Sequence, residues 1–118
     1  MNILSPEDCI KKVFETLGYG YKEHIYQNAL CIELRNNLYT FHNEVIVPIY
    51  YENIQIGYER ADIIIYKPEK CILELKAQNT LTKKDAVQLK KYLINTDTQK
   101  GLLVNFGSED LNIQKITL

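Results

Sequence analysis

The sequence lacks any run of apolar residues long enough to cross a bilayer, and its first residues, MNILSPEDCIKK, lack the basic and then apolar layout of a signal peptide. It holds only three cysteines, Cys9, Cys31 and Cys71, whose odd number and wide spacing fit neither a disulfide framework nor a paired metal site. We therefore expect an intracellular protein, in a cytoplasm or a nucleus, with no membrane partner and with reduced, buried thiols.

An excess of positive charge is also lacking, because the formal net charge is −1. Extensive, indiscriminate binding of nucleic acid rests on many lysine and arginine contacts to phosphates, so any such surface must be local. The basic residues are concentrated in one segment, at Lys83, Lys84, Lys90 and Lys91. A lysine-rich segment of this kind is usually only the solvated face of a helix.

Neither an internal repeat nor a linker nor a low-complexity tract interrupts the chain. Its 118 residues, 46% hydrophobic and 25% charged, have the size and composition of one ordinary globular domain. We therefore expect residues 1–118 to form a single domain.

Two helices are predicted at the start of the chain. Ser5 followed by proline and two acids is the pattern of a helix N-cap, and apolar residues then recur at helical spacing until Gly18. A broad apolar face predicts a second helix from about Tyr21 to Leu38. Glu23 then lies in the first turn of that second helix.

From Thr40 the pattern changes to β-branched and aromatic residues separated by short turns. It predicts an antiparallel meander of three strands at 41–51, 54–66 and 71–77. A third helix is predicted from about Thr82 to Ile94, with strands at 101–106 and 112–118 after it. Because strand–helix–strand crossovers are right-handed, residues 101–106 should run parallel to 71–77. The fold class is α/β, a mixed sheet flanked by helices in the order α-α-β-β-β-α-β-β.

Ionisable residues interrupt two apolar strands of this meander. Asp62 opens the run ADIIIY, while Glu74 and Lys76 lie within CILELKA. Charges in a buried strand are costly unless they are paired or bind a metal. Glu74 and Lys76 share a face of their strand, and antiparallel pairing lets Asp62 reach the same face. Two carboxylates are hard ligands suited to Mg²⁺ or Mn²⁺, and an ammonium group beside them suits phosphodiester hydrolysis.

The same residues have a structural interpretation. A Glu-x-Lys pair on a strand is commonly an ordinary ion pair, and Asp62 could pair with Arg60 or Lys76. The tripeptide of residues 74–76 alone favours this interpretation. The aspartate twelve residues earlier, on a paired strand, makes the two interpretations about equal.

Two predicted helices carry further candidates. Glu23 stands where the helix dipole alone favours an acid, and that explanation is the better one for Glu23 in isolation. In the third helix, Gln88 and Tyr92 are neighbours at i and i+4, with Lys84 and Lys91 on the same side. Those lysines could contact phosphates.

Taken together, these residues make the sequence similar to the PD-(D/E)XK nuclease superfamily, and within it to the small GxxExxY proteins. Gly20, Glu23 and Tyr26 spell the motif that names that group, and residues 27–30 continue in its manner. Residues 60–62 match the metal-binding aspartate of the superfamily, and residues 74–76 match its Glu-x-Lys element. Gln88 and Tyr92 match the Gln-xxx-Tyr helix of the RecB-like and lambda-exonuclease-like branches.

The resemblance implies a restriction-endonuclease-like core and a Mg²⁺ or Mn²⁺ cofactor. It implies that Asp62 and Glu74 are metal ligands and that Glu23 completes the acidic site, directly or through water. It also implies that Lys76 positions or deprotonates the attacking water. Asp62, Glu74, Lys76 and Glu23 are therefore the candidate catalytic residues.

The third helix has supporting roles in the same resemblance. Gln88 and Tyr92 would orient the lysine or the DNA backbone, next to Lys84 and Lys91. The chain departs from the superfamily at Asp85, where a histidine is often expected before the Gln-xxx-Tyr segment.

Three hypotheses follow. The first is a nuclease that cleaves DNA in repair, recombination or processing. The second is an accessory module that keeps the nuclease fold and binds nucleic acid or a partner without cleavage. The third is a buried ion-pair network with no metal. A homodimer through the exposed edge strand near the C-terminus, or a larger nucleic-acid-processing complex, is compatible with the first two.

Overall fold

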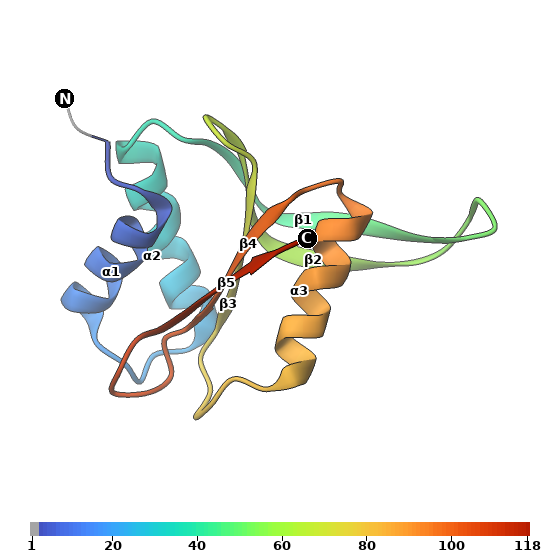
Figure 1. The fold of residues 1–118 in the computed structure, drawn as a ribbon. Coiled ribbons are helices and arrows are strands. Elements are labelled where there is room, and N and C mark those ends of the chain that lie inside the picture. The colour runs from blue at the N-terminus through green and yellow to red at the C-terminus, as the bar shows by residue number, and fades with distance from the viewer. Residues whose placement is uncertain (1–2) are drawn as a thin grey trace.

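The computed structural model describes residues 3–118 and contains the eight elements in the predicted order (Figure 1). The helices are α1 (Pro6–Leu17), α2 (Glu23–Asn36) and α3 (Lys83–Asn95). The strands are β1 (Thr40–Tyr51), β2 (Ile54–Lys67), β3 (Cys71–Lys76), β4 (Lys100–Asn105) and β5 (Asn112–Thr117). Within the described residues, no helix combines the length and the apolar character needed to span a membrane.

Helix α1 begins and ends as its sequence predicts. The Ser5 side chain accepts a hydrogen bond from the Asp8 N–H, and Gly18 follows the last turn with a φ of 68°. Helix α2 is shorter than the predicted span of Tyr21 to Leu38. Gly20 has a φ of 111°, which keeps the chain out of helical geometry just before α2 begins. Leu38 has a φ of 65°, so the helix cannot continue through that residue.

The five strands form one sheet in the order β1-β2-β3-β4-β5. All neighbouring strands are antiparallel except β3 and β4, which are parallel across the α3 crossover. Both the predicted meander and the predicted parallel pair are therefore confirmed.

Two layers of helix cover the sheet, with α1 and α2 on one face and α3 on the other (Figure 1). Leu73 and Leu75 of β3 pack into the core beneath α1 and α2. Ile72 packs into the core beneath α3. Because side chains alternate along a strand, Glu74 and Lys76 share the α3 face with Ile72.

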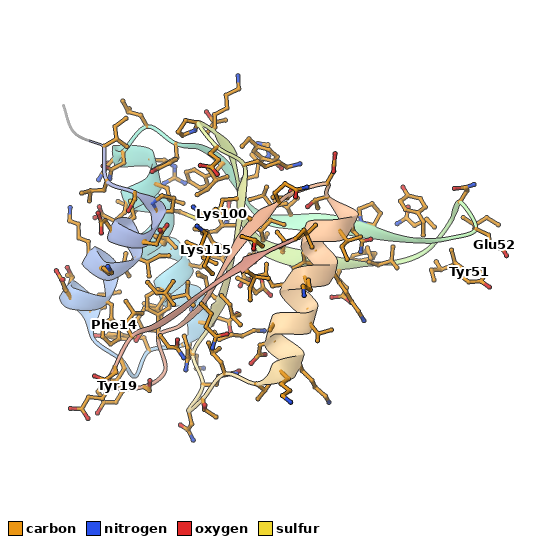
Figure 2. All side chains as sticks on the ribbon, viewed as in Figure 1. Phe14, Tyr19, Tyr51, Glu52, Lys100 and Lys115 are labelled. Atoms are coloured by element: carbon orange, nitrogen blue, oxygen red, sulfur yellow. The ribbon has the colours of Figure 1, made fainter. Side chains whose placement is uncertain are left out.

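The hairpin of β1 and β2 extends well beyond the rest of the molecule (Figure 1). Its turn is the two-residue segment Glu52–Asn53, in which both residues have positive φ, as a tight hairpin turn requires. Figure 2 shows Tyr51 and Glu52 at the far end. We call residues 46–60 the arm.

Candidate active site

Regular pairing between β2 and β3 ends at Ile63 and Leu73, and two acidic side chains take over beyond it. The Asp62 N–H donates to Glu74 Oε1 at 3.2 Å. The Leu75 N–H donates to Asp62 Oδ2 at 2.7 Å. Each carboxylate therefore replaces a carbonyl of the interrupted ladder, and the backbone fixes the position of both groups. Asp62 and Glu74 are neighbours across adjacent strands.

The site is unfavourable for two negative charges. Glu74 is 3% exposed. Burial, and secondly the charge of Asp62, raise the pKa of Glu74 to about 9. Burial also raises the pKa of Asp62, while the hydrogen bond from the Leu75 N–H acts to lower it. Two adjacent buried carboxylates ionise together only when a cation compensates them, and otherwise one of them keeps its proton.

Lys76 brings an ammonium group to the same face. Its Nζ lies 4.0 Å from Glu74 Oε2 and 3.9 Å from Asp85 Oδ1. It donates a hydrogen bond of 3.2 Å to Gln88 Oε1 from helix α3. Gln88, which the resemblance implies would orient the lysine or the DNA backbone, therefore contacts the ammonium group directly.

Glu23 reaches this cluster from the other helical layer, as the first residue of α2. It is partly buried, and burial raises its pKa; the charge of Asp62 adds to that effect and the charge of Lys76 opposes it. Glu23 therefore shares an electrostatic environment with Asp62 and Lys76.

Tyr26, the last position of the GxxExxY pattern, anchors the loop that precedes Glu23. The Tyr26 hydroxyl donates to the Gly18 carbonyl at 2.7 Å and accepts from the Tyr21 N–H at 3.2 Å. The Tyr26 ring stacks on Phe106, with ring centroids 4.4 Å apart. Tyr26 therefore ties the α1–α2 loop to the first turn of α2, three residues after Glu23.

Tyr92 lies between helix α3 and strand β2. Its side chain is buried under the sheet, and its hydroxyl donates to the Arg60 carbonyl at 3.2 Å. Burial raises the pKa of this phenol. Tyr92 contacts the backbone of β2 two residues before Asp62, so it supports that strand. Of the two helix residues, Gln88 is the one that contacts Lys76.

The ion-pair interpretation receives little support from the described residues. Arg60 is exposed, and no ion pair within residues 3–118 joins it to Asp62. The contact between Lys76 and Glu74 is long for a buried pair. The carboxylates are positioned mainly by backbone N–H groups.

The residues of this site suit a divalent cation. Within residues 3–118, no three histidine, cysteine or acidic side chains already stand together as a metal cage. Mg²⁺ needs no such cage, because it usually binds one or two carboxylates and keeps several waters. The hydrogen bond from the Leu75 N–H uses Oδ2 of Asp62, and that from the Asp62 N–H uses Oε1 of Glu74. Asp62 and Glu74 thus supply hard oxygen ligands of the kind that Mg²⁺ prefers.

A hydrogen-bond network below Lys76 was not predicted from the sequence. Asp85 forms a capping box with Thr82 and accepts from the Gln78 side chain at 2.7 Å. Asn105 holds the same loop, since its side chain donates to the Gln78 carbonyl and accepts from the Gln78 N–H. Two signals could have revealed this network: the Thr-x-x-Asp spacing at the helix start and the polar residue within GLLVNF.

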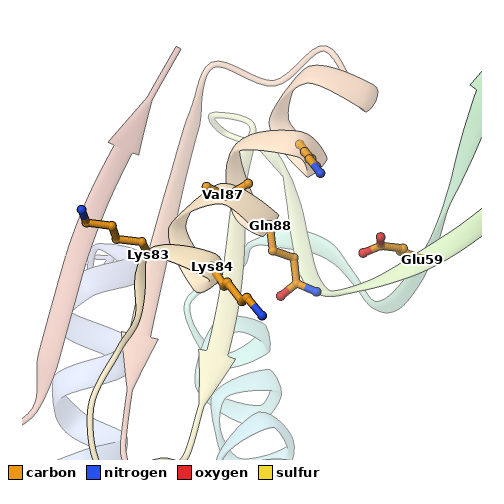
Figure 3. Close-up of a pocket in the computed structure, with 6 residues that line it drawn as sticks. Glu59, Lys83, Lys84, Val87 and Gln88 are labelled. Carbon is orange, nitrogen blue, oxygen red and sulfur yellow. The ribbon is translucent and has the colours of Figure 1, made fainter.

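A groove of about 350 Å³ adjoins the site on the outer side of α3 (Figure 3). Figure 3 shows Lys84 and Gln88 reaching toward the strand that carries Glu59, whereas Lys83 points the other way. The lining residues are Glu59, Lys83, Lys84, Val87, Gln88 and Lys91. Lys84 and Lys91 therefore border the groove that leads to the partner of Lys76.

Comparisons with known proteins agree with this geometry. No curated protein matches the chain. Among solved structures, the chain is similar to the crystal structure of SSO0001, with a TM-score of 0.64 and 22% sequence identity. The similarity covers 80% of this chain and 50% of that protein, so the chain spans about half its length. It shows a shared fold.

A family model reaches further along the sequence. The model of the PD-(D/E)XK nuclease superfamily matches residues 5–116, which include every element from α1 to β5 apart from the last residue of β5. The match contains Asp62, Glu74 and Lys76 on their two adjacent strands. The chain therefore belongs to the PD-(D/E)XK nuclease superfamily.

Proposed function

We propose that this chain is a divalent-metal-dependent nuclease that hydrolyses phosphodiester bonds in DNA. The observation that carries the proposal is the pair of neighbouring carboxylates, partly buried Asp62 and buried Glu74, fixed by backbone N–H groups with an ammonium group alongside. Membership of a nuclease superfamily supports hydrolysis of nucleic acid. The DNA substrate rests on the resemblance to the RecB-like and lambda-exonuclease-like branches, as does a role in repair, recombination or processing.

In this proposal Asp62 and Glu74 hold Mg²⁺ or Mn²⁺, and Glu23 contributes from α2, directly or through a water molecule. When bound, the ion supplies Lewis-acid polarisation of the phosphate and lowers the pKa of a water. Glu74 gives up its proton when the site is loaded, because a cation then offsets the charge of Asp62.

Lys76 holds the attacking water in this proposal and stabilises charge that develops on the phosphate. Gln88 Oε1 fixes the ammonium group from one side, and the Asp85 carboxylate attracts it from another. The lysine is therefore preorganised before substrate binds, which avoids a reorganisation cost during the reaction.

The groove beside α3 is the proposed path of the substrate backbone. Lys84 and Lys91 line it and can neutralise phosphates next to the scissile bond. Lys90 lies on the same helix and does not line the groove. It therefore provides a matched control for charge effects.

A cleavage assay tests the proposal. Purified protein would be incubated with Mg²⁺ or Mn²⁺ and with single-stranded, duplex, flapped and branched DNA and matched RNA. We expect cleavage of DNA that falls on the order of 10²-fold or more in Glu74→Gln and in Lys76→Met. Glu69→Gln, at an exposed position, is the control that should retain activity. Failure of the wild type to cut any substrate with either metal would overturn the proposal.

The accessory-module hypothesis is the second candidate, and the lysine-lined groove favours it because phosphate binding there needs no metal. It is distinguished by measuring DNA affinity in EDTA at several salt concentrations. Under this hypothesis Lys84→Glu and Lys91→Glu weaken DNA binding, whereas Lys90→Glu has little effect on it. Glu74→Gln binds DNA as tightly as the wild type, and neither of these two proteins cleaves it. Cleavage by the wild type alone would decide for the nuclease.

A further inference from the structure

The loop between α1 and α2 carries two exposed aromatic side chains next to the candidate active site. Tyr19 is 56% exposed and Tyr21 is 52% exposed. Tyr21 lies two residues before Glu23, the first residue of α2. This loop lies at the same end of the molecule as the end of β3 and the start of α3 (Figure 1). The proposed hydrolysis of the phosphodiester uses neither tyrosine.

Tyr21 is held at the surface by the ring beneath it. Its N–H donates to the Tyr26 hydroxyl at 3.2 Å, and its ring meets the Tyr26 ring edge to face, with centroids 6.1 Å apart. Tyr26 in turn stacks on Phe106, and the Phe106 N–H donates to the Lys76 carbonyl at 2.8 Å. An edge-to-face contact covers at most one face of a ring. Tyr21 is therefore a fixed ring, linked through two others to the strand of Lys76, with a face that Tyr26 does not cover.

Positive charge accompanies this aromatic surface. Lys22 is exposed between Tyr21 and Glu23. Lys84 and Lys91 line the groove beside α3, which covers the opposite face of the sheet. Proteins that bind a single strand combine a positively charged path for the backbone with aromatic side chains on which bases stack. The two sides of the site together offer both kinds of group.

We propose that Tyr21 stacks on an unpaired base of the substrate, so that the chain acts on single-stranded DNA. This inference rests on the proposed function and adds the substrate class to it. A base inside a duplex already stacks on its neighbours, and exposing its face costs unpairing and unstacking. An unpaired base meets an aromatic ring without that cost, and every base has a face that can stack.

A purely structural role for Tyr21 is the alternative, because its ring also packs on Tyr26. The two roles are separable. The hydrogen bond to Tyr26 comes from the backbone N–H of residue 21, so it survives replacement of the side chain. Tyr21→Leu removes the aromatic ring and keeps an apolar side chain in its place. A structural defect would weaken the binding of every nucleic acid, whereas loss of stacking weakens only binding that depends on a base.

The test measures affinity in EDTA by fluorescence anisotropy, with two labelled oligonucleotides of equal length. One is an oligothymidine strand, and the other has abasic sites in place of the thymines. Both carry the same phosphate charge, so a difference in affinity reports contacts with the bases. We expect the wild type to bind the thymidine strand about 5- to 100-fold more tightly than the abasic strand.

Tyr21→Leu should lose most of this preference, while its affinity for the abasic strand and for a blunt duplex stays at the wild-type value. Tyr51→Leu is the matched control that should keep the preference. Tyr51 is a similarly exposed tyrosine, at 64%, and Figure 2 shows it at the far end of the arm. Circular dichroism verifies that each variant is folded.

A tryptophan substitution reports the stacking directly. The chain contains no tryptophan, so Tyr21→Trp introduces a single indole, and Tyr51→Trp does the same at the tip of the arm. We expect the thymidine strand to quench the fluorescence of Tyr21→Trp, because a base stacked on indole quenches it. The abasic strand should not, and neither strand should change the fluorescence of Tyr51→Trp.

Three results would overturn the proposal. They are a wild type that does not prefer the thymidine strand, a Tyr21→Leu variant that keeps the preference, and a Tyr21→Trp variant whose fluorescence does not respond to a saturating thymidine strand. Equal losses of duplex and single-strand binding in Tyr21→Leu would assign Tyr21 to the structure of the loop and would equally refute stacking. Because only binding without metal is measured, failure here leaves the nuclease proposal intact, and failure to cleave leaves this test intact.

Discussion

Glu74 makes the stability of the metal-free protein depend on pH. In the unfolded chain this carboxyl titrates near its ordinary pKa of 4.5, whereas in the folded protein burial and Asp62 raise that pKa to about 9. Between these values the folded protein holds one proton more than the unfolded chain. Stability therefore falls as the pH rises through this interval.

The magnitude follows from proton linkage. One extra bound proton in the folded state changes the free energy of unfolding by about −1.4 kcal/mol per pH unit. Between pH 6 and pH 8 the metal-free wild type should lose up to about 2.7 kcal/mol on account of Glu74. Glu74→Gln removes the titration while keeping an oxygen that can accept from the Asp62 N–H. The variant should therefore lack this slope.

Urea unfolding in EDTA at pH 6, 7 and 8 measures the effect, with Glu69→Gln as the control that keeps the wild-type slope. Addition of Mg²⁺ at pH 8 should restore stability to the wild type and not to Glu74→Gln, because a bound cation favours the ionised pair. If wild type and Glu74→Gln showed the same dependence on pH, the argument that burial holds a proton on Glu74 would be refuted.

Three further predictions concern the frame of the site. Gly107→Ala should lower the free energy of unfolding by about 1–3 kcal/mol, because the added Cβ would press into the backbone of Gln78. Thermal unfolding measures this loss, and an unchanged melting temperature would contradict it. Tyr26→Phe should cost about 1–2 kcal/mol and reduce cleavage by loosening the turn that carries Glu23; equal activity and stability would count against that role. Burial raises the pKa of the Cys71 thiol to about 12. A thiol reagent at pH 8 should therefore label Cys71 only after the protein unfolds. Rapid labelling of the native protein would be inconsistent with the structure.

Local patterns in the sequence predict most of the fold. Hydrophobic periodicity and turn residues give the eight elements in order, and the crossover rule gives the parallel β3–β4 pair. The juxtaposition of Asp62 and Glu74 is also predictable, because the short turn between β2 and β3 fixes the register. Gln88 is predictable as a neighbour of Lys76, because one helix returns directly over the strand.

Features that depend on packing between distant segments were not predicted. Helical spacing places Tyr92 beside Gln88, but the closeness of α3 to the sheet decides that Tyr92 is buried and reaches β2. The Asn105 network depends on where the strand β4 ends relative to the loop after β3. The apolar residues of the arm have the alternation of a covered strand, yet no helix lies over Ile54 or Ile56.

The most direct test of the account is calorimetric titration of Mn²⁺ into the wild type, Asp62→Asn and Glu74→Gln at pH 8. We expect the wild type to bind the ion with release of a proton, visible as a heat that varies with the ionisation enthalpy of the buffer, and both variants to lose affinity at least about tenfold. Equal binding of Mn²⁺ by the wild type and both variants would contradict the claim that these two carboxylates hold the metal.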